Sequence, residues 1–336
     1  MIRNSVIAVC IAVCGIGLIQ IHAESPITLQ RTIPLTGVKG KFDHFAVDEA
    51  GHRLFAAATG NKTVEVVDLA TGTKLQSIAG LGKPHGLAWV AQKGLLFVAD
   101  GEKAELNVFK GSPLKLIRSI KLSDDADDLV YDNATNVLYV GHGGSDTANP
   151  ASVAIIDGES LSLIANIAVA AHPEALELDE TGHRVFVNIS DAGQVVVIDG
   201  RSHAVVNKWQ LNGAKGNTPL AYDVADDLLL VGCRTPAKLL VLNGKTGKEI
   251  ASAPSDTGAD DLFYEPATHR AYLITGSGAV DTFAVSADGK LEALAVTGTV
   301  AGAKTGLLVP SQRSLYIGIP GTTFPAEVRV YQTGAR

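Results

Sequence analysis

Short apolar runs alternate with polar turn residues along most of the chain, which is the pattern of many short β-strands. One such run recurs with a polar or small pair of residues before it, and an acidic residue follows it in most copies. The copies are Asp43–Asp48, His85–Val90, Asp127–Asp132, Glu174–Asp179, Thr218–Asp223, Asp260–Glu265 and Thr305–Pro310. Their third residues are 42, 42, 47, 44, 42 and 45 positions apart. This period predicts an all-β fold, a seven-bladed β-propeller of four-stranded blades.

Within the first repeat, the alternation predicts four strands, at Phe45–Val47, Arg53–Ala58, Thr63–Asp68 and Lys74–Ile78. Second strands of the later repeats are predicted at Leu95–Ala99, Val137–Val140, Arg184–Asn188, Leu228–Val231, Ala271–Ile274 and Leu315–Ile317. The seventh repeat has a third strand at Val328–Tyr331 and no outer strand after it, whereas Thr28–Leu35 resembles an outer strand and precedes the first inner strand. We therefore expect the N-terminal strand to complete the last blade and to remove two exposed strand edges.

The first 23 residues have the features of a signal peptide. Arg3 supplies a positive start, Ser5–Ile19 is apolar, and Ala23 is a small residue suited to cleavage before Glu24. A lipid anchor on Cys14 is the alternative. We expect residues 24–336 to form a single domain without a transmembrane span, located in the periplasm or secreted. Only Cys233 remains after cleavage, so no intramolecular disulfide is expected.

Composition and charge exclude several function classes. The net charge of −7 becomes −8 when Arg3 is removed, and the remaining Lys and Arg residues are scattered singly. Nucleic acid is therefore not the expected partner. The chain has no Gly-x-Ser-x-Gly, no His-Glu-x-x-His and no phosphate-binding Gly-rich loop, so no catalytic residue is assigned.

Candidate functional residues precede the inner strands. In a propeller, the inner strands line a central channel, so the two residues before each third position should form two rings around the axis. His172 lies close to one of these pairs, and His142 belongs to the longest loop between second and third strands, residues 141–150. The predicted ligand-binding residues are Asp43, His44, His85, Asp127, Asp128, His142, His172, Glu174, Asp260 and Asp261.

The two rings hold six carboxylates, which cannot all stay charged without compensation. Two carboxylates about 6 Å apart repel by about 3 kcal/mol at an effective dielectric of about 20. One solution is a divalent cation, and its predicted ligands are Asp43, His85, Asp127, Glu174 and Asp260. A second is an ion-pair network with Lys39, Lys41, Lys83, Lys215, Lys304 and Arg234. A third is an organic or peptide ligand of mixed charge.

The histidines divide by their place in the repeat. His52, His183 and His269 follow the inner strands in turns on the opposite face, and His203 lies in a later hairpin turn, so all four are expected to be solvated turn residues. His142 is expected in an exposed loop, either without a role or as part of a flexible lid that contributes an imidazole.

The repeats resemble those of the exported bacterial seven-bladed propellers of the YVTN or YncE-like group, over essentially the whole mature chain. The residues that carry the resemblance are Arg53–Ala57 followed by Thr63–Asp68, Leu138–Gly141 and Val185–Asn188, although Tyr-Val-Thr-Asn itself does not occur. The resemblance implies an exported binding or surface protein, a group without an established reaction, and a non-catalytic role in which the axial face binds a small ligand, an ion or a protein partner. The alternative is a metal-dependent enzyme of the lactonase or lyase type, in which a central cation polarises a carbonyl and His85, His142 or His172 transfers a proton.

Overall fold

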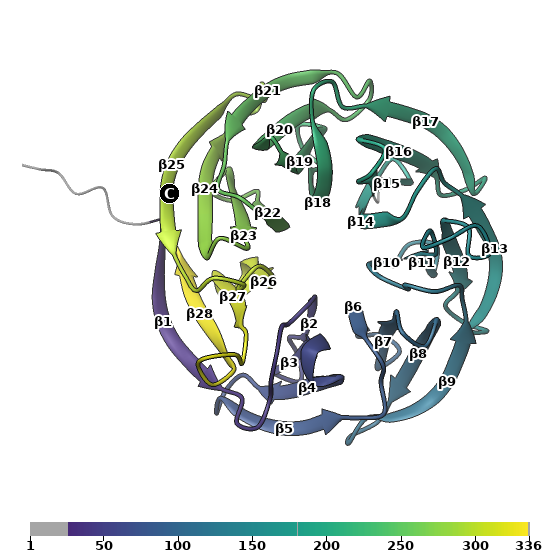
Figure 1. Cartoon of the computed structure of the whole chain (residues 1–336), viewed down its shortest axis with the longest axis vertical. Coiled ribbons are helices and arrows are strands. Elements are labelled where there is room, and N and C mark those ends of the chain that lie inside the picture. The colour runs from purple at the N-terminus through teal and green to yellow at the C-terminus, as the bar shows by residue number, and fades with distance from the viewer. Residues whose placement is uncertain (1–25, 180, 335–336) are drawn as a thin grey trace, which may run out of the picture.

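The computed structural model of the protein describes residues 26–179 and 181–334, so the predicted signal peptide lies outside the described residues. These residues form seven four-stranded antiparallel sheets that surround a common axis as the blades of a ring (Figure 1). The predicted all-β, seven-bladed propeller is confirmed. Within each of the first six blades, the four strands follow one another in sequence order from the axis outward.

The blades have the following strands. Blade 1 contains β2 (Phe45–Asp48), β3 (Arg53–Ala58), β4 (Thr63–Asp68) and β5 (Thr73–Ile78), and blade 2 contains β6 (Pro84–Val90), β7 (Leu95–Asp100), β8 (Glu105–Lys110) and β9 (Lys115–Lys121). Blade 3 contains β10 (Leu129–Asp132), β11 (Val137–His142), β12 (Ser152–Asp157) and β13 (Ser162–Ala168), and blade 4 contains β14 (Pro173–Asp179), β15 (Arg184–Ile189), β16 (Gln194–Asp199) and β17 (Ala204–Gln210). Blade 5 contains β18 (Lys215–Asp223), β19 (Leu228–Thr235), β20 (Ala237–Asn243) and β21 (Glu249–Pro254), and blade 6 contains β22 (Ala259–Glu265), β23 (Arg270–Thr275), β24 (Ala279–Val285) and β25 (Leu291–Gly298). Blade 7 contains β26 (Gly306–Val309), β27 (Ser314–Ile319), β28 (Glu327–Thr333) and β1 (Ile27–Pro34).

Seven apolar clusters fill the spaces between neighbouring blades. Each cluster combines residues of two adjacent blades, as where Phe97 of β7 and Leu138 of β11 join blades 2 and 3. The second and third strands have apolar residues on both faces because they lie between two such clusters, and all six residues of β7 are buried. Full burial of one Leu or Phe side chain contributes about 1.5–3 kcal/mol, so the packing between blades is a main source of stability.

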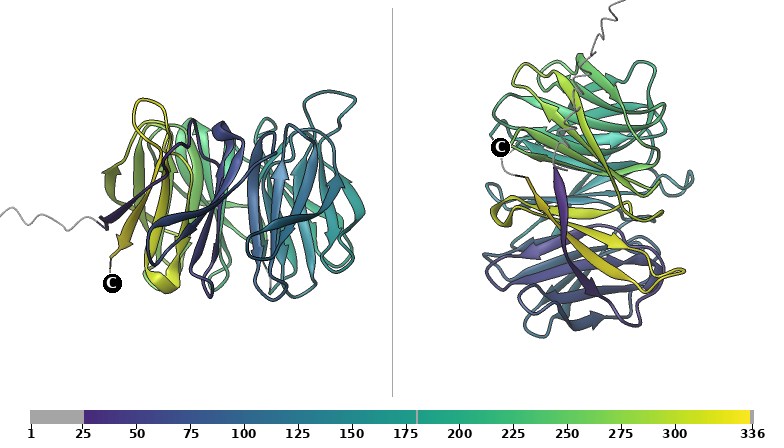
Figure 2. Two further views of the ribbon diagram at one scale, coloured as in Figure 1. Left: turned by 90° about the horizontal axis from the view of Figure 1, so that it is seen from below. Right: turned by 90° about the vertical axis from the view of Figure 1, so that its left-hand side faces the viewer.

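All seven blades have a register shift between the third and the outer strand. The shifts lie at Val66/Val67, Val108/Phe109, Ile155/Ile156, Val197/Ile198, Val241/Leu242, Thr282/Phe283 and, in blade 7, Leu29/Arg31. A β-bulge bends its strand and increases the local twist, in agreement with the strongly twisted blades seen from the side in Figure 2.

The N-terminal strand completes the last blade, as predicted. β1 pairs antiparallel with β28, from Ile27 opposite Thr333 to Pro34 opposite Glu327. Figures 1 and 2 show this purple strand beside the yellow C-terminal strands. The side chains of Ile27, Ile33 and Leu35 are fully buried or nearly so, and they join the apolar clusters on the two sides of blade 7.

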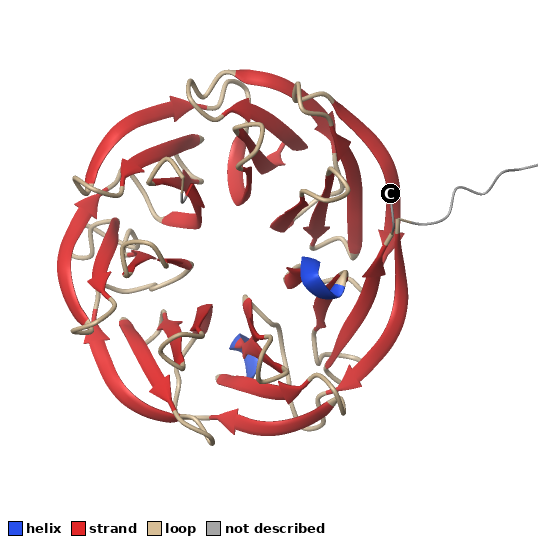
Figure 3. Ribbon diagram, turned by 180° about the vertical axis from the view of Figure 1, so that it is seen from behind, coloured by secondary structure: helices blue, strands red, loops and turns tan. Residues whose placement is uncertain are grey.

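Helical structure is limited to two short 3-10 turns in the described part of the chain, η1 (Thr59–Asn61) and η2 (Pro310–Gln312), drawn in blue in Figure 3. No helix among residues 26–179 and 181–334 has the length and apolar character that a bilayer crossing requires.

Candidate functional site

The first residues of the inner strands, the loops that lead into these strands and the end of β19 enclose a polar pocket of about 160 Å³ on the propeller axis. Six of the ten predicted ligand-binding residues line it, namely Asp43, His44, His85, Asp127, Glu174 and Asp260. The remaining lining residues are Lys41, Ala175, Thr218, Arg234 and Lys304. The sevenfold repeat thus brings side chains from the ring positions of blades 1 to 6 together. Blade 7 contributes Lys304, from the loop before its inner strand, in place of its ring residues.

A row of hydrogen-bonded acid and imidazole side chains lies along one side of the pocket. His85 Nδ1 lies 2.7 Å from Asp43 Oδ2 and 3.2 Å from Asp127 Oδ1. Because this one nitrogen bridges the two carboxylates, His85 holds them next to each other. His85 itself is buried, and its Nε2 has no hydrogen-bond partner among the described residues. Burial opposes ionisation of Asp43, but the hydrogen bond with His85 and the charges of His44 and Lys304 lower its pKa below the ordinary range.

His172, from the loop before β14, extends this row of side chains. Its Nδ1 donates to the carbonyl oxygen of Gly143 over 2.7 Å, and its Nε2 lies 3.2 Å from Asp127 Oδ2. Burial disfavours the imidazolium, yet the hydrogen bonds to Asp127 and Gly143 outweigh it and raise the pKa of His172 to about 9. His172 is therefore a cation at neutral pH. It does not line the pocket directly but contacts a residue that does.

His44 lies at the centre of three carboxylates. Its Nδ1 is 3.4 Å from Asp261 Oδ1, and its Nε2 is 3.5 Å from Asp43 Oδ1 and 3.9 Å from Asp128 Oδ1. The His44 side chain is 24% exposed. Burial alone would lower the pKa of His44, but Asp128, Asp261 and Asp43 raise it well above the ordinary value. The His44 imidazolium therefore balances acids that come from blades 1, 3 and 6.

Asp128 and Asp261 also connect neighbouring blades. Asp128 Oδ2 accepts a hydrogen bond from the Leu176 backbone N–H over 2.9 Å, and Asp261 Oδ2 accepts one from the Gly306 N–H over 2.7 Å. Burial raises the pKa of Asp128 to about 6 in spite of His44. Both residues line a second cavity of about 250 Å³ instead of the polar pocket, and these two predicted ligand residues have a structural role between blades.

Blades 5 to 7 supply the cationic side of the pocket. Asp260 accepts hydrogen bonds from Arg234 and Lys304, and Arg234 Nε also donates to the Ala259 carbonyl oxygen over 2.8 Å. Burial raises the pKa of Asp260, against the effect of Lys304. Asp260 is thus neutralised by protein cations, as the ion-pair alternative describes.

Glu174 differs from Asp260. No ion pair or hydrogen bond of its side chain is found within residues 26–179 and 181–334, and burial together with Asp127 raises its pKa.

Glu177 is a site residue that the sequence reasoning missed. It lies in the second cavity, among Leu129, Leu176 and Leu220, and burial raises its pKa to about 8. The signal was present in the repeats, because the residues at the same position of the other copies are apolar, namely Ala46, Ala88, Val130, Ala221, Phe263 and Leu308. Glu177 is half-buried, and an acid that replaces an apolar residue at such a position is costly and marks an exception to the repeat.

The expectation of an exposed His142 is wrong. Strand β11 continues to His142, which pairs with Ser152 and is only 3% exposed. Its Nδ1 accepts a hydrogen bond from the Ser123 N–H, and its Nε2 lies 2.9 Å from Asn166 Oδ1 in the outer strand β13. Burial lowers the pKa of His142, so the imidazole is neutral, and it does not line the axial pocket.

The other histidines and the free cysteine have structural positions. His52, His183, His203 and His269 all have positive φ angles of 51° to 54° in their turns, as turn residues at tight hairpins do. Cys233 is buried, and burial raises the pKa of its thiol to about 12, so it is not a thiolate at neutral pH.

Comparison with known proteins agrees on the fold. A chain of the hydrazine synthase of Kuenenia stuttgartiensis matches with a TM-score of 0.77 and 17% identity, over 92% of this chain and 100% of that chain. A chain of the mitotic checkpoint complex has a TM-score of 0.77 and 13% identity, over 98% and 99%. The WD40 repeats of RRP9 have a TM-score of 0.77 and 12% identity, over 92% and 97%.

No family model and no curated protein matches the sequence. At these low identities, the structural likeness shows the fold alone. The protein is therefore a seven-bladed β-propeller, and because one fold hosts many functions, its function has to be argued from the site.

Proposed function

We propose that this chain is a binding protein whose axial pocket takes up a small ligand that carries both a positive and a negative group. The observation that carries the proposal is the division of charge across the pocket. Asp43, Asp127 and Glu174 come from blades 1, 3 and 4. The cations are Arg234 in β19 of blade 5, Lys304 in the loop before β26 of blade 7, and Lys41 in the loop before β2 of blade 1. A ligand cation would face Glu174, and a ligand carboxylate would face Lys41 and Arg234.

The size of the pocket limits the ligand. A volume of about 160 Å³ holds about five water molecules at ~30 Å³ each, which corresponds to a small amino acid or hydroxy acid. Glu174 and Lys41 have no ion pair within the described ranges, so both are available to a ligand. The resemblance of the repeats to the YVTN or YncE-like group supports export, and we propose a periplasmic or secreted location.

A thermal-shift and calorimetric screen tests the pocket. Glycine, β-alanine and other small zwitterions are compared with acetate and methylammonium, which carry one charge each. We expect at least one zwitterion to raise the melting temperature and to bind more tightly than either single-charge control. The substitutions Glu174→Gln and Lys41→Gln should each weaken binding about 10- to 100-fold, because each removes one charge-assisted hydrogen bond of ~1.5–3 kcal/mol.

Glu159→Gln is the matched control, because Glu159 is an exposed acid paired with Lys93 outside the pocket. It should bind the ligand as the wild type does. The proposal fails if the zwitterions are no better than the single-charge controls, or if the pocket variants bind as tightly as the wild type.

A divalent cation is the second candidate occupant and supports the enzyme alternative. One ligand atom each of Asp43, His44 and Asp127 lie within 4.8 Å of one another, which is about the separation of ligand atoms on opposite sides of one ion. Of the five predicted metal ligands, only Asp43 and Asp127 belong to this group. His85 bridges these two carboxylates, and Asp260 is engaged by Arg234 and Lys304.

Metal binding at this group should depend strongly on pH. The surrounding acids hold a proton on His44, and a metal ion must displace that proton. We expect added Mn²⁺ or Zn²⁺ to bind about tenfold more tightly for each pH unit between about pH 6 and 8, and Asp43→Ala to abolish the effect. Elemental analysis and thermal shift with and without chelator give the measurement. The absence of a stoichiometric ion at the higher pH would leave the metal-dependent enzyme without support.

A further inference from the structure

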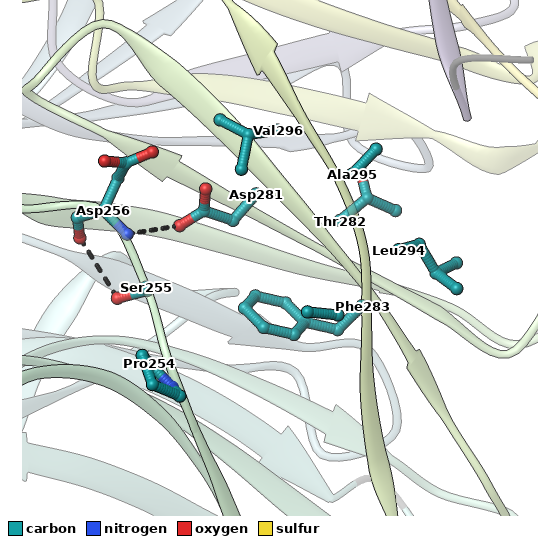
Figure 4. Close-up of a pocket in the computed structure, with 10 residues that line it drawn as sticks. Pro254, Ser255, Asp256, Asp281, Thr282, Phe283, Leu294, Ala295 and Val296 are labelled. Carbon is teal, nitrogen blue, oxygen red and sulfur yellow. Dashed lines mark hydrogen bonds between the residues drawn. The ribbon is translucent and has the colours of Figure 1, made fainter. Parts of the chain in front are cut away.

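A third cavity lies in the outer wall, between blades 5 and 6, and it shares no lining residue with the axial pocket. Figure 4 shows it between the segment after β21 and the edge of β25, and its volume is about 390 Å³. This volume is in the range of small-molecule sites. Most of the wall is apolar, with Pro254, Phe283, Leu294, Ala295 and Val296, and the acids Asp256 and Asp281 are the charged lining residues.

The carboxylate of Asp281 is buried in this cavity wall, and only one of its two oxygens has a hydrogen-bond partner. Asp281 is 3% exposed, and its Oδ2 accepts a hydrogen bond from the Asp256 backbone N–H over 2.7 Å. Its Oδ1 has no hydrogen-bond partner in the described part of the chain, and neither has Oγ1 of the adjacent Thr282. An unsatisfied buried polar group destabilises the folded state, so both atoms require an explanation.

The same position in other blades shows what Asp281 lacks. In blade 2, Asn107 lies opposite Ser119 of the outer strand, and the Ser119 hydroxyl donates to Asn107 Oδ1 over 2.6 Å. In blade 1, Glu65 lies opposite Ser77, and the Ser77 hydroxyl donates to it in the same way. In blade 6, the residue opposite Asp281 is Val296, which has no donor and is 64% exposed.

The charge around Asp281 is not compensated. No ion pair of Asp281 or Asp256 is found within residues 26–179 and 181–334, in contrast to Glu65, which has Lys74 3.5 Å away. Burial and the neighbouring Asp256 raise the pKa of Asp281 to about 6. A positive hydrogen-bond donor is therefore the group that this wall lacks.

We propose that this cavity binds a small organic cation, a primary amine with a short aliphatic chain. Its ammonium group donates to Oδ1 of Asp281, and its chain packs against Phe283, Leu294 and Val296. The apolar walls favour the aliphatic chain, and the paired carboxylates of Asp281 and Asp256 exclude anions of the same shape.

Three probes of equal chain length test the proposal by calorimetry on the full protein: hexylammonium, 1-hexanol and hexanoate. We expect hexylammonium to bind at least about tenfold more tightly than 1-hexanol, because a charged donor contributes more than a neutral one, and hexanoate not to bind. In the variant Asp281→Asn, the preference for the ammonium over the alcohol should disappear.

The substitution Val296→Ser is the sharper test because it changes an exposed side chain. It supplies the hydroxyl donor that Ser119 supplies to Asn107 in blade 2, so Asp281 gains an internal partner. We expect it to weaken hexylammonium binding about tenfold or more while keeping or raising the melting temperature. Asp288→Asn is the charge-matched control, since Asp288 is 59% exposed in a turn of the same blade, and it should leave binding unchanged.

Equal binding of hexylammonium and hexanoate would overturn the proposal. It would also be overturned if the ammonium preference persists in both Asp281→Asn and Val296→Ser, because the amine would then occupy another acidic site such as the axial pocket. These outcomes do not depend on Glu174 or Lys41, so the wall site and the axial site are tested separately.

Discussion

Removal of residues 27–36 should yield a protein that no longer forms a stable ring. The deletion removes β1, and with it the buried side chains of Ile27, Ile33 and Leu35. At about 2–3 kcal/mol for each side chain, the lost burial alone is about 6–9 kcal/mol, a large part of the 5–15 kcal/mol by which a typical domain is stable. The deletion also exposes the backbone of β28, which becomes an unpaired strand edge.

We expect the shortened protein to aggregate, or to lose its cooperative thermal transition, in circular dichroism and size-exclusion chromatography. A synthetic peptide of residues 26–36 added in trans should restore the transition in a concentration-dependent way. Leu29→Thr is the control within the same strand, because Leu29 is exposed, and it should change stability little. An unchanged melting temperature of the shortened protein would show that the closure of blade 7 does not stabilise the ring.

Replacement of His44 by Gln should be the most damaging single substitution on the axis. It leaves Asp43, Asp128 and Asp261 close together without the cation among them. Removal of one partner from a buried charge cluster costs about 3–5 kcal/mol. We therefore expect a loss of this order in the free energy of unfolding near neutral pH, measured by urea denaturation.

The destabilisation caused by His44→Gln should depend on pH. The folded-state pKa of His44 is raised, so its contribution is fully present below about pH 6.5 and is lost as the pH rises through the folded value. In the variant, acidification relieves part of the repulsion, because burial raises the pKa of Asp128 to about 6 and this one acid becomes protonated. The difference between wild type and variant should thus shrink toward about pH 4–5 and again at strongly alkaline pH.

His52→Asn is the matched control, since His52 is an exposed turn residue with positive φ, which Asn tolerates well. Its effect on the free energy of unfolding should be small. A His44→Gln effect that is equally small, or that does not change between about pH 5 and 8, would mean that His44 does not carry the charge that balances the three acids.

The strands and their arrangement could be predicted from the sequence because each blade repeats the same local pattern. Arg53–Ala58 and Thr63–Asp68 begin and end in the structure where the alternation places them. The extension of β19 to Thr235, beyond the predicted Val231, was missed because Cys233 to Thr235 lack the apolar alternation. The expectation for His142 was wrong because the local pattern does not show its contacts. Its hydrogen-bond partner Asn166 belongs to the outer strand of the blade, which comes later in the sequence.

Three features follow from the sequence alone: seven blades surround one axis, the N-terminal strand closes the ring, and acids and histidines gather at one opening. These conclusions rest on a repeat period and on local strand patterns, which are properties of neighbouring residues. The identity of the neutralised acids, in contrast, became known from the folded arrangement of the blades. His44 of blade 1 meets Asp128 of blade 3 and Asp261 of blade 6, and Asp260 meets Arg234 and Lys304 from the adjacent blades. Pairing across an axis depends on side-chain reach and on the rotation between blades, and a linear pattern contains neither quantity.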